Sequence, residues 1–230
     1  MIARRTLRRC AVSVLALGCA QSQPAAAPPP APAPAPAATP ATPAIAAADT
    51  NAAGLVPAGY GTLRQEDIAI KLFLPDVDVR LTPLDESVIR TLSPDSYRAL
   101  RELAESRRAA IARLAAQRGL LRGNLWYVSF FGRAPDARFS PLELTVTSGG
   151  HAFRPVEILP LTTGFGEQRL QPRETQSAIY IFDDALDVNQ RLVVSLGSQR
   201  SESWEGTLRN IERERVLIRS RVQRVGAPAP

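Results

Sequence analysis

The sequence predicts a mainly β, α+β fold, namely an antiparallel β-sandwich with one inserted amphipathic helix and a C-terminal helix. Three observations lead to this prediction. Two neighbouring segments near residue 75 alternate apolar and polar residues, as half-buried strands do. Five further short apolar segments follow Gly123, each bounded by Pro, Gly, Asp or Asn. Between these groups, and again at the C-terminus, apolar residues recur at the period of a helix.

The first two strands are predicted in DIAIKLFL, residues 67–74, and DVDVRLTPL, residues 76–84. Because side chains alternate between the two faces of a strand, Lys71 and Phe73 fall on the face opposite the apolar row. Pro75 marks the turn between the two segments. The residues expected to point inward are Ile68, Ile70, Leu72, Leu74, Val77, Val79 and Leu81.

One amphipathic helix is predicted over residues 94–118, with Ser93 as its N-cap and Gly119 as its C-cap. One side of this helix carries five arginines against two glutamates. Such a basic face is either a solvated surface or a contact for anionic lipid headgroups or an acidic partner. Arg107 and Arg108 are candidate contact residues.

The remaining segments complete the sandwich. In PLELTVTSGG, residues 141–150, Leu142 is expected to point inward with Leu144 and Val146. Trp204 begins a segment with helical spacing, although its run RVLIRSRV also fits an edge strand. The outline is similar to the immunoglobulin-like domains of many envelope proteins, but the sequence lacks their Cys-Trp-Cys signature. The resemblance therefore implies architecture and no function.

Residues 1–18 have the order of a secretory signal peptide, with four arginines, a short apolar run and Gly18. The run is far shorter than the roughly 20 residues of a membrane-spanning helix. Leu15-Ala16-Leu17-Gly18-Cys19 resembles the lipobox of bacterial lipoproteins. This resemblance implies cleavage before Cys19, a diacylglycerol on its thiol and an acylated amino terminus, and Ala20 fits the pattern of lipoproteins sent to the outer membrane. The alternative is an ordinary cleaved signal peptide with an incidental cysteine.

The export route stays open, because Arg4-Arg5-Thr6-Leu7-Arg8 is also similar to a twin-arginine signal. Residues 19–54 then form a Pro/Ala-rich tether, and from Pro24 to Pro43 nine of twenty residues are proline. This composition favours extended polyproline II, so the 31 residues from Pro24 to Gly54 reach up to about 95 Å. A single globular domain over residues 55–226 and a tail, 227–230, complete the chain.

Composition argues against two classes of function. The net charge is +6, but without the four arginines before Cys10 only 24 basic residues face 22 acidic ones, so no nucleic-acid partner is expected. The cysteines, Cys10 and Cys19, both precede the domain, and His151 is the one histidine. A zinc site or a serine triad would need more such residues, so we expect no transition-metal site and no catalytic His151.

The best candidate for a chemical site is the segment FDDALDVNQ, residues 182–190, which contains Asp183, Asp184, Asp187 and Asn189. Their side chains suit capped turns between strands. The same hard oxygens are the ligands that calcium prefers, and paired carboxylates also serve hydrolysis. All three interpretations remain open.

A second candidate is the polar loop GFGEQRLQPRET, residues 164–175. We expect it to present Phe165, Arg169 and Arg173 on the surface, because an exposed aromatic residue beside arginines is typical of interface centres. The alternative is a long hairpin connection without a binding role.

These observations predict a lipid-anchored lipoprotein of the cell envelope, at the outer membrane and facing the periplasm or the cell surface. Its domain is expected to act as a non-enzymatic interaction or assembly module for an envelope protein or a cell-wall component. The alternatives are an envelope hydrolase that uses the acidic residues, and calcium-assisted binding of a glycan or peptide.

Overall fold

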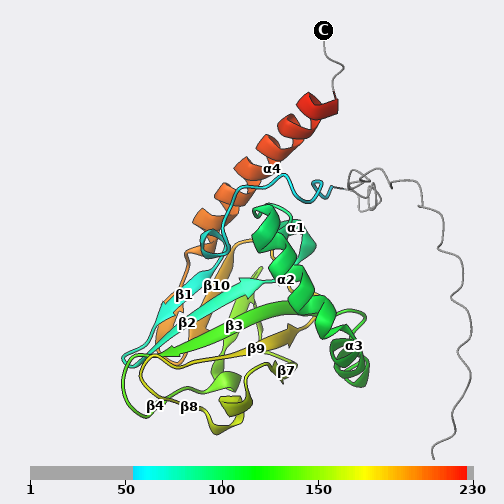
Figure 1. Ribbon diagram of the computed structural model, residues 1–230. Coiled ribbons are helices and arrows are strands. Elements are labelled where there is room, and N and C mark those ends of the chain that lie inside the picture. The colour runs from blue at the N-terminus through cyan, green and yellow to red at the C-terminus, as the bar shows by residue number, and fades with distance from the viewer. Residues whose placement is uncertain (1–53, 227–230) are drawn as a thin grey trace, which may run out of the picture. The chain divides into compact units, whose positions relative to one another are not determined.

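The computed structural model describes residues 54–226, which form three antiparallel sheets and four α-helices (Figure 1). The helices are α1 (Glu86–Ile89), α2 (Pro94–Ser106), α3 (Arg108–Gln117) and α4 (Trp204–Gly226). The strands are β1 (Ile70–Phe73), β2 (Val77–Pro83), β3 (Asn124–Gly132), β4 (Ala137–Arg138), β5 (Thr145–Ser148), β6 (His151–Phe153), β7 (Glu157–Pro160), β8 (Arg169–Leu170), β9 (Thr175–Phe182), β10 (Leu192–Leu196) and β11 (Gln199–Ser201).

The larger sheet has the strand order β1-β2-β3-β9-β7 and the smaller one β11-β10-β5-β6, while β4 and β8 form a separate pair. Every strand pair is antiparallel. The predicted antiparallel β-sandwich, with helical structure inserted between its second and third strands and a C-terminal helix, is therefore confirmed. The likeness to immunoglobulin domains stays a likeness of outline.

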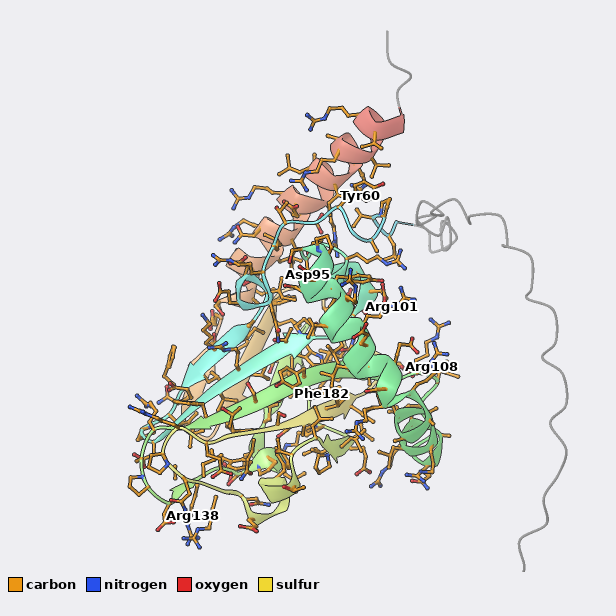
Figure 2. All side chains as sticks on the ribbon, in the orientation of Figure 1. Tyr60, Asp95, Arg101, Arg108, Arg138 and Phe182 are labelled. Carbon is orange, nitrogen blue, oxygen red and sulfur yellow. The ribbon has the colours of Figure 1, made fainter. Side chains whose placement is uncertain are left out.

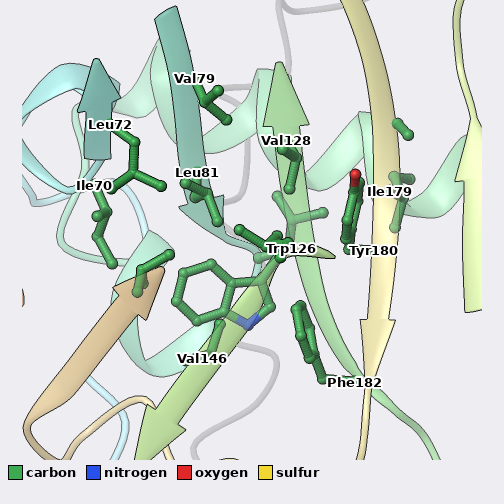
Figure 3. Packing of buried hydrophobic residues seen from close by; sticks show 14 of the residues in the cluster. Ile70, Leu72, Val79, Leu81, Trp126, Val128, Val146, Ile179, Tyr180 and Phe182 are labelled. Carbon is green, nitrogen blue, oxygen red and sulfur yellow. The ribbon is translucent and has the colours of Figure 1, made fainter. Parts of the chain in front are cut away.

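The core between the sheets contains two fully buried tryptophans, and Figure 3 shows one of them, Trp126, among its apolar neighbours. The ring centroids of Trp126 on β3 and Trp204 at the start of α4 lie 6.2 Å apart. Each indole N–H has a partner, since Trp204 Nε1 donates to the Val188 carbonyl at 2.9 Å and Trp126 Nε1 donates to Asn124 Oδ1 at 2.7 Å. Apolar area is thus removed from water without orphaned donors.

Tyr180 on β9 also lies in this core and donates its hydroxyl to the Pro141 carbonyl at 3.2 Å. Burial raises the pKa of Tyr180 far above its ordinary value, because the phenolate would be desolvated. The side chain is therefore a neutral hydrogen-bond donor at physiological pH.

The helical insertion covers part of the outer face of the larger sheet (Figure 1). On this face β3 and β9 place Tyr127 beside Ile179 and Leu125 beside Ile181. Leu100 of α2 and Ile111 of α3 are buried in the same apolar cluster. The helices thus bury one half of the sheet's outer face and leave the other half without a helical cover.

The insertion corrects the predicted single helix over residues 94–118. The chain forms α2 and α3 instead, and Arg107 between them has φ −111° and ψ 2°, which is not helical. The Arg107 N–H donates to Ala104 O at 3.2 Å, and Ser106 Oγ donates to Leu103 O at 2.9 Å. Serine competes with the helix by such hydrogen bonds to the backbone. The break redirects α3 toward β7.

One further expectation is corrected. Leu142 lies in a 3₁₀ turn, Pro141–Glu143, where its side chain is 68% exposed instead of pointing inward. The run RVLIRSRV lies within α4, so the predicted C-terminal helix is confirmed and the alternative of an edge strand is excluded. None of the helices within residues 54–226 is both long enough and apolar enough to cross a bilayer.

Candidate functional site

Asp184 of the acidic loop acts as a backbone cap. One carboxylate oxygen accepts from the Leu121 N–H at 2.8 Å and the other from the Gly123 N–H at 2.6 Å. Both N–H groups belong to the connection between α3 and β3. The carboxylate therefore ties the loop after β9 to that connection, which is a structural task.

The other carboxylates of the loop serve separate turns. Asp183 Oδ1 accepts from the Ala185 N–H at 2.9 Å, and Asp187 Oδ1 accepts from the Asn189 N–H at 2.8 Å. Asn189 Oδ1 in turn accepts from Arg215 of α4 at 2.8 Å. Within residues 54–226 no three His, Cys, Asp or Glu side chains converge on a point where a metal ion would bind. The geometry thus favours the capped-turn interpretation of this cluster over the calcium one.

His151 on β6 lines a surface hollow of about 680 Å³ together with Ser148, Asp183 and Asp187. Sequence reasoning treated the histidine and the acidic loop separately, and the fold brings them to one place. Among the described residues, however, no hydrogen bond joins His151 to a serine or a carboxylate, and Ser148 Oγ donates to the Asp187 carbonyl. The hollow therefore contains no nucleophile that is paired with a base.

The loop over residues 164–175 differs from the prediction at its aromatic residue. Phe165 is only 4% exposed, and its ring packs at 5.4 Å from Phe139 and 5.9 Å from Phe130. The expectation of an exposed Phe165 is wrong, because the 3₁₀ turn Thr163–Glu167 directs the ring into the core. Its two arginines do lie at the surface.

Of these arginines, Arg169 bonds to Asp136 at 2.6 Å. The hydrogen bond from Arg169 holds the pKa of Asp136 below its ordinary value. Arg173 adopts a left-handed backbone with φ 65°. The other predicted contact pair lies at the corner between α2 and α3, where Arg108 bonds to Glu105 at 2.8 Å and points outward (Figure 2).

A surface that sequence reasoning missed lies on the half of the larger sheet without helical cover. The strand register places Phe73, Asp78, Phe131 and Thr175 in one row across β1, β2, β3 and β9. The adjacent row on the same face contains Lys71, Arg80 and Ser129. These residues line a hollow of about 380 Å³. We call the seven residues of the two rows the uncovered sheet face.

The two rings of this face are unusually accessible. Phe73 is 61% exposed and Phe131 is 37% exposed, and no other aromatic residue within 54–226 is among the exposed large apolar side chains. Two exposed phenylalanines thus share a single row of a single sheet. Only Phe73, on the face opposite the core row, was indicated by the sequence, whereas the position of Phe131 depends on the pairing of β2 with β3.

The charge of the uncovered sheet face is positive. Asp78 is held by Arg133 at 3.1 Å, and Arg133 also donates to the Pro75 carbonyl at 2.8 Å. Lys71 and Arg80 are exposed and, within the described part of the chain, make no ion pair with a carboxylate. The face therefore combines one acidic residue that is paired with Arg133, two cations that have no carboxylate partner among the described residues, and two exposed aromatic rings.

The first described residues are fastened to α4 by a buried carboxylate. Glu214 is 4% exposed and accepts from the Thr62 N–H and hydroxyl, both at 2.9 Å, and from Arg221 at 2.6 Å. Arg221 also donates to the Tyr60 carbonyl at 2.7 Å. Desolvation alone would raise the pKa of Glu214, but the bonds from Arg221 and Thr62 outweigh it and hold the pKa below its ordinary value. This contribution to stability is present above pH 4.5 and is lost as the pH falls below that value.

Comparison of the chain with protein-family models, with curated proteins and with solved structures finds no match.

Proposed function

We propose that the protein is a lipid-anchored envelope lipoprotein whose domain is a non-enzymatic interaction module. The observation that carries the interaction role is the uncovered sheet face, where Phe73 and Phe131 share one row beside two cations. Aromatic rings with a neighbouring arginine are the residues enriched at interface centres. In the acidic loop, by contrast, the carboxylates accept hydrogen bonds from backbone N–H groups and so cap turns.

The anchor rests on the sequence alone. Cys19 lies outside the described residues, as do the signal peptide and the tether, and the lipobox resemblance of Leu15 to Cys19 is what supports lipidation. Several acyl chains, at about 0.8 kcal/mol for each buried methylene, would hold the protein at a membrane. The Pro/Ala-rich segment would then act as the spacer that lets the domain meet a partner in the envelope.

The partner that fits the uncovered sheet face is a protein segment with acidic and apolar side chains. Lys71 and Arg80 supply charge complementarity for its carboxylates, and the two phenylalanines supply apolar area. The hollow that these residues line has a volume of about 380 Å³, which fits a peptide-like segment better than a large flat interface. An envelope protein with such a segment is the occupant we propose.

Replacing Cys19 with serine is expected to abolish incorporation of a labelled fatty acid in cells and to move the protein from the membrane fraction to the soluble one. The thiol is the atom that would carry the diacylglycerol. Cys10→Ser is the matched control, because it removes the other cysteine and should leave labelling intact. Undiminished label on the Cys19→Ser protein would refute the anchor.

Replacing both Phe73 and Phe131 with serine is expected to weaken partner capture by at least about tenfold, since two such rings together contribute more than about 1.4 kcal/mol at an interface. Capture is measured by chemical crosslinking in cells and identification of the attached protein. Leu142→Ser is the control, because Leu142 is also exposed but lies off the uncovered sheet face. Equal loss in the control, or no loss in the double variant, would contradict the proposed face.

A further inference from the structure

A second surface lies on the C-terminal half of α4. Figure 1 shows that this helix continues well past the strands. Its inner side is buried, with Ile211 and Ile218 fully enclosed. Its outer side holds two exposed aliphatic residues and three exposed arginines, which we call the α4 basic face: Arg213, Val216, Leu217, Arg219 and Arg224.

These five residues form one continuous strip. At about 100° of helix rotation per residue, Arg213, Val216, Leu217 and Arg224 lie within about 100° of one another, and Arg219 flanks them. Val216 is 57% exposed and Leu217 is 48% exposed. Basic side chains therefore precede and follow two accessible aliphatic ones, along a helix whose opposite side is buried as far as Ile218.

The charge of this segment is positive and largely uncompensated. Residues 213–226 contain five arginines and one glutamate, a net charge of +4, and that glutamate, Glu214, is buried against Arg221. Arg215 is occupied by Glu212 at 2.5 Å and by the Ser87 carbonyl at 2.7 Å. The three arginines of the α4 basic face form no ion pair with any carboxylate in the described part of the chain.

We propose that the α4 basic face docks on an anionic lipid surface, an inference that rests on the lipid anchor proposed at Cys19. Arginines near a membrane are attracted by anionic headgroups, and interleaved aliphatic side chains can enter the boundary between headgroups and acyl chains. The strip has no aromatic residue, which distinguishes it from the uncovered sheet face and from the usual centre of a protein interface.

The position of the face within the fold agrees with this occupant. Tyr60, close to the start of the described chain, lies beside the same half of α4, since Arg221 donates to its carbonyl (Figure 2). Gly54 follows Cys19 by 35 residues, so an anchored domain stays within about 110 Å of the bilayer. Such tethering raises the effective concentration of the membrane and lets a weak docking contact operate.

The test uses the mature chain, residues 19–230 with Cys19→Ser, so that no acyl chain contributes to binding. Co-sedimentation is measured with vesicles of phosphatidylcholine mixed with phosphatidylglycerol and with vesicles of phosphatidylcholine alone. We expect binding to the anionic vesicles only, and loss of that binding in concentrated salt. No binding to anionic vesicles, or equal binding to neutral ones, would overturn the proposal.

The matched variants locate the contact. Replacing Arg213, Arg219 and Arg224 together with glutamine is expected to weaken anionic-vesicle binding on the order of 100-fold, at about fivefold for each arginine. Replacing Arg107, Arg108 and Arg113 with glutamine removes the same charge from α3 and the residue before it, and should leave binding nearly unchanged. Equal loss in the two triple variants, or loss in the second one alone, would overturn the assignment to α4.

Two controls separate this proposal from others. We expect each triple variant to keep the unfolding temperature of the unmodified protein, because the replaced arginines are exposed, and thermal unfolding checks that the fold is retained. The vesicle assay contains no lipidated protein. A negative result in it would therefore overturn the docking of α4 without bearing on the lipid anchor, which the fatty-acid labelling at Cys19 tests separately. Self-association of the protein without vesicles, abolished by the α4 variant, would instead indicate a second copy as the occupant and overturn the lipid proposal.

Discussion

Replacing Trp204 with alanine is expected to lower the free energy of unfolding by about 3–5 kcal/mol. The indole is fully buried between the sheets and packs against Trp126 at a centroid distance of 6.2 Å. The variant would also leave the Val188 carbonyl without the donor that now bonds to it. Because domains are stable by only about 5–15 kcal/mol, much of the total would be lost.

The measurement is urea unfolding followed by the fluorescence of Trp126, the other tryptophan of the chain. Trp204→Phe is the matched variant, because it keeps a six-membered aromatic ring and removes only the five-membered ring with its N–H. Trp204→Phe should lower the free energy of unfolding by clearly less than Trp204→Ala does. A cost below about 1 kcal/mol for Trp204→Ala would mean that α4 does not close the core as described.

Replacing Gly61 with alanine is expected to lower the free energy of unfolding by about 2–3 kcal/mol, which is near the upper end for overpacking. An added Cβ would lie 2.2 Å from the Thr91 carbonyl oxygen and 2.3 Å from its carbon, which are backbone atoms and cannot rotate away. The close approach exists because Leu63 pairs with this segment, donating to Thr91 O at 3.2 Å and accepting from Ser93 N at 2.8 Å.

The expected structural result of Gly61→Ala is release of residues 55–63 from the domain. Hydrogen exchange and limited proteolysis would show new exposure there, while the sheets remain protected. Gly166→Ala is the control, since a Cβ at that position meets no atom within 4 Å. Unchanged protection of residues 55–63 in the Gly61→Ala protein would contradict the described contact.

Several strands could be predicted because their side chains alternate over a buried face. Val77, Val79 and Leu81 point inward as expected, and Lys71 and Phe73 take the other face. The break at Arg107 could not be predicted, because no glycine or proline marks it. It depends on where α3 finds apolar area beside β7, which is a tertiary effect that overrides local propensity.

The candidate site was harder to predict than the fold. Phe165 and Phe131 are both phenylalanines near glycines, yet one is buried under Phe139 and the other is exposed. What separates them is the path of a 3₁₀ turn in one case and the limit of the helical cover in the other. The local sequence pattern predicts neither the path of the turn nor the limit of the cover, since both depend on contacts between residues distant in sequence.

In the acidic loop, by contrast, the local sequence was sufficient to predict the role of most of the carboxylates. Asp and Asn cap turns through short-range bonds, and Asp183 and Asp187 each bond to the N–H two residues ahead. The longer bonds of Asp184 to Leu121 and Gly123 add a link that the sequence does not reveal. The same residues that suggested calcium are therefore accounted for by the backbone.

The central claim is that an anchored domain binds an envelope protein through its uncovered sheet face. The most direct measurement is photo-crosslinking in cells from a probe at Ser129, which lies beside Arg80 on the uncovered sheet face, compared with the same probe at Leu142. We predict one dominant crosslinked protein from position 129, reduced when Cys19 is serine, and none from position 142. The same crosslinks from both positions, or none from position 129, would contradict the claim.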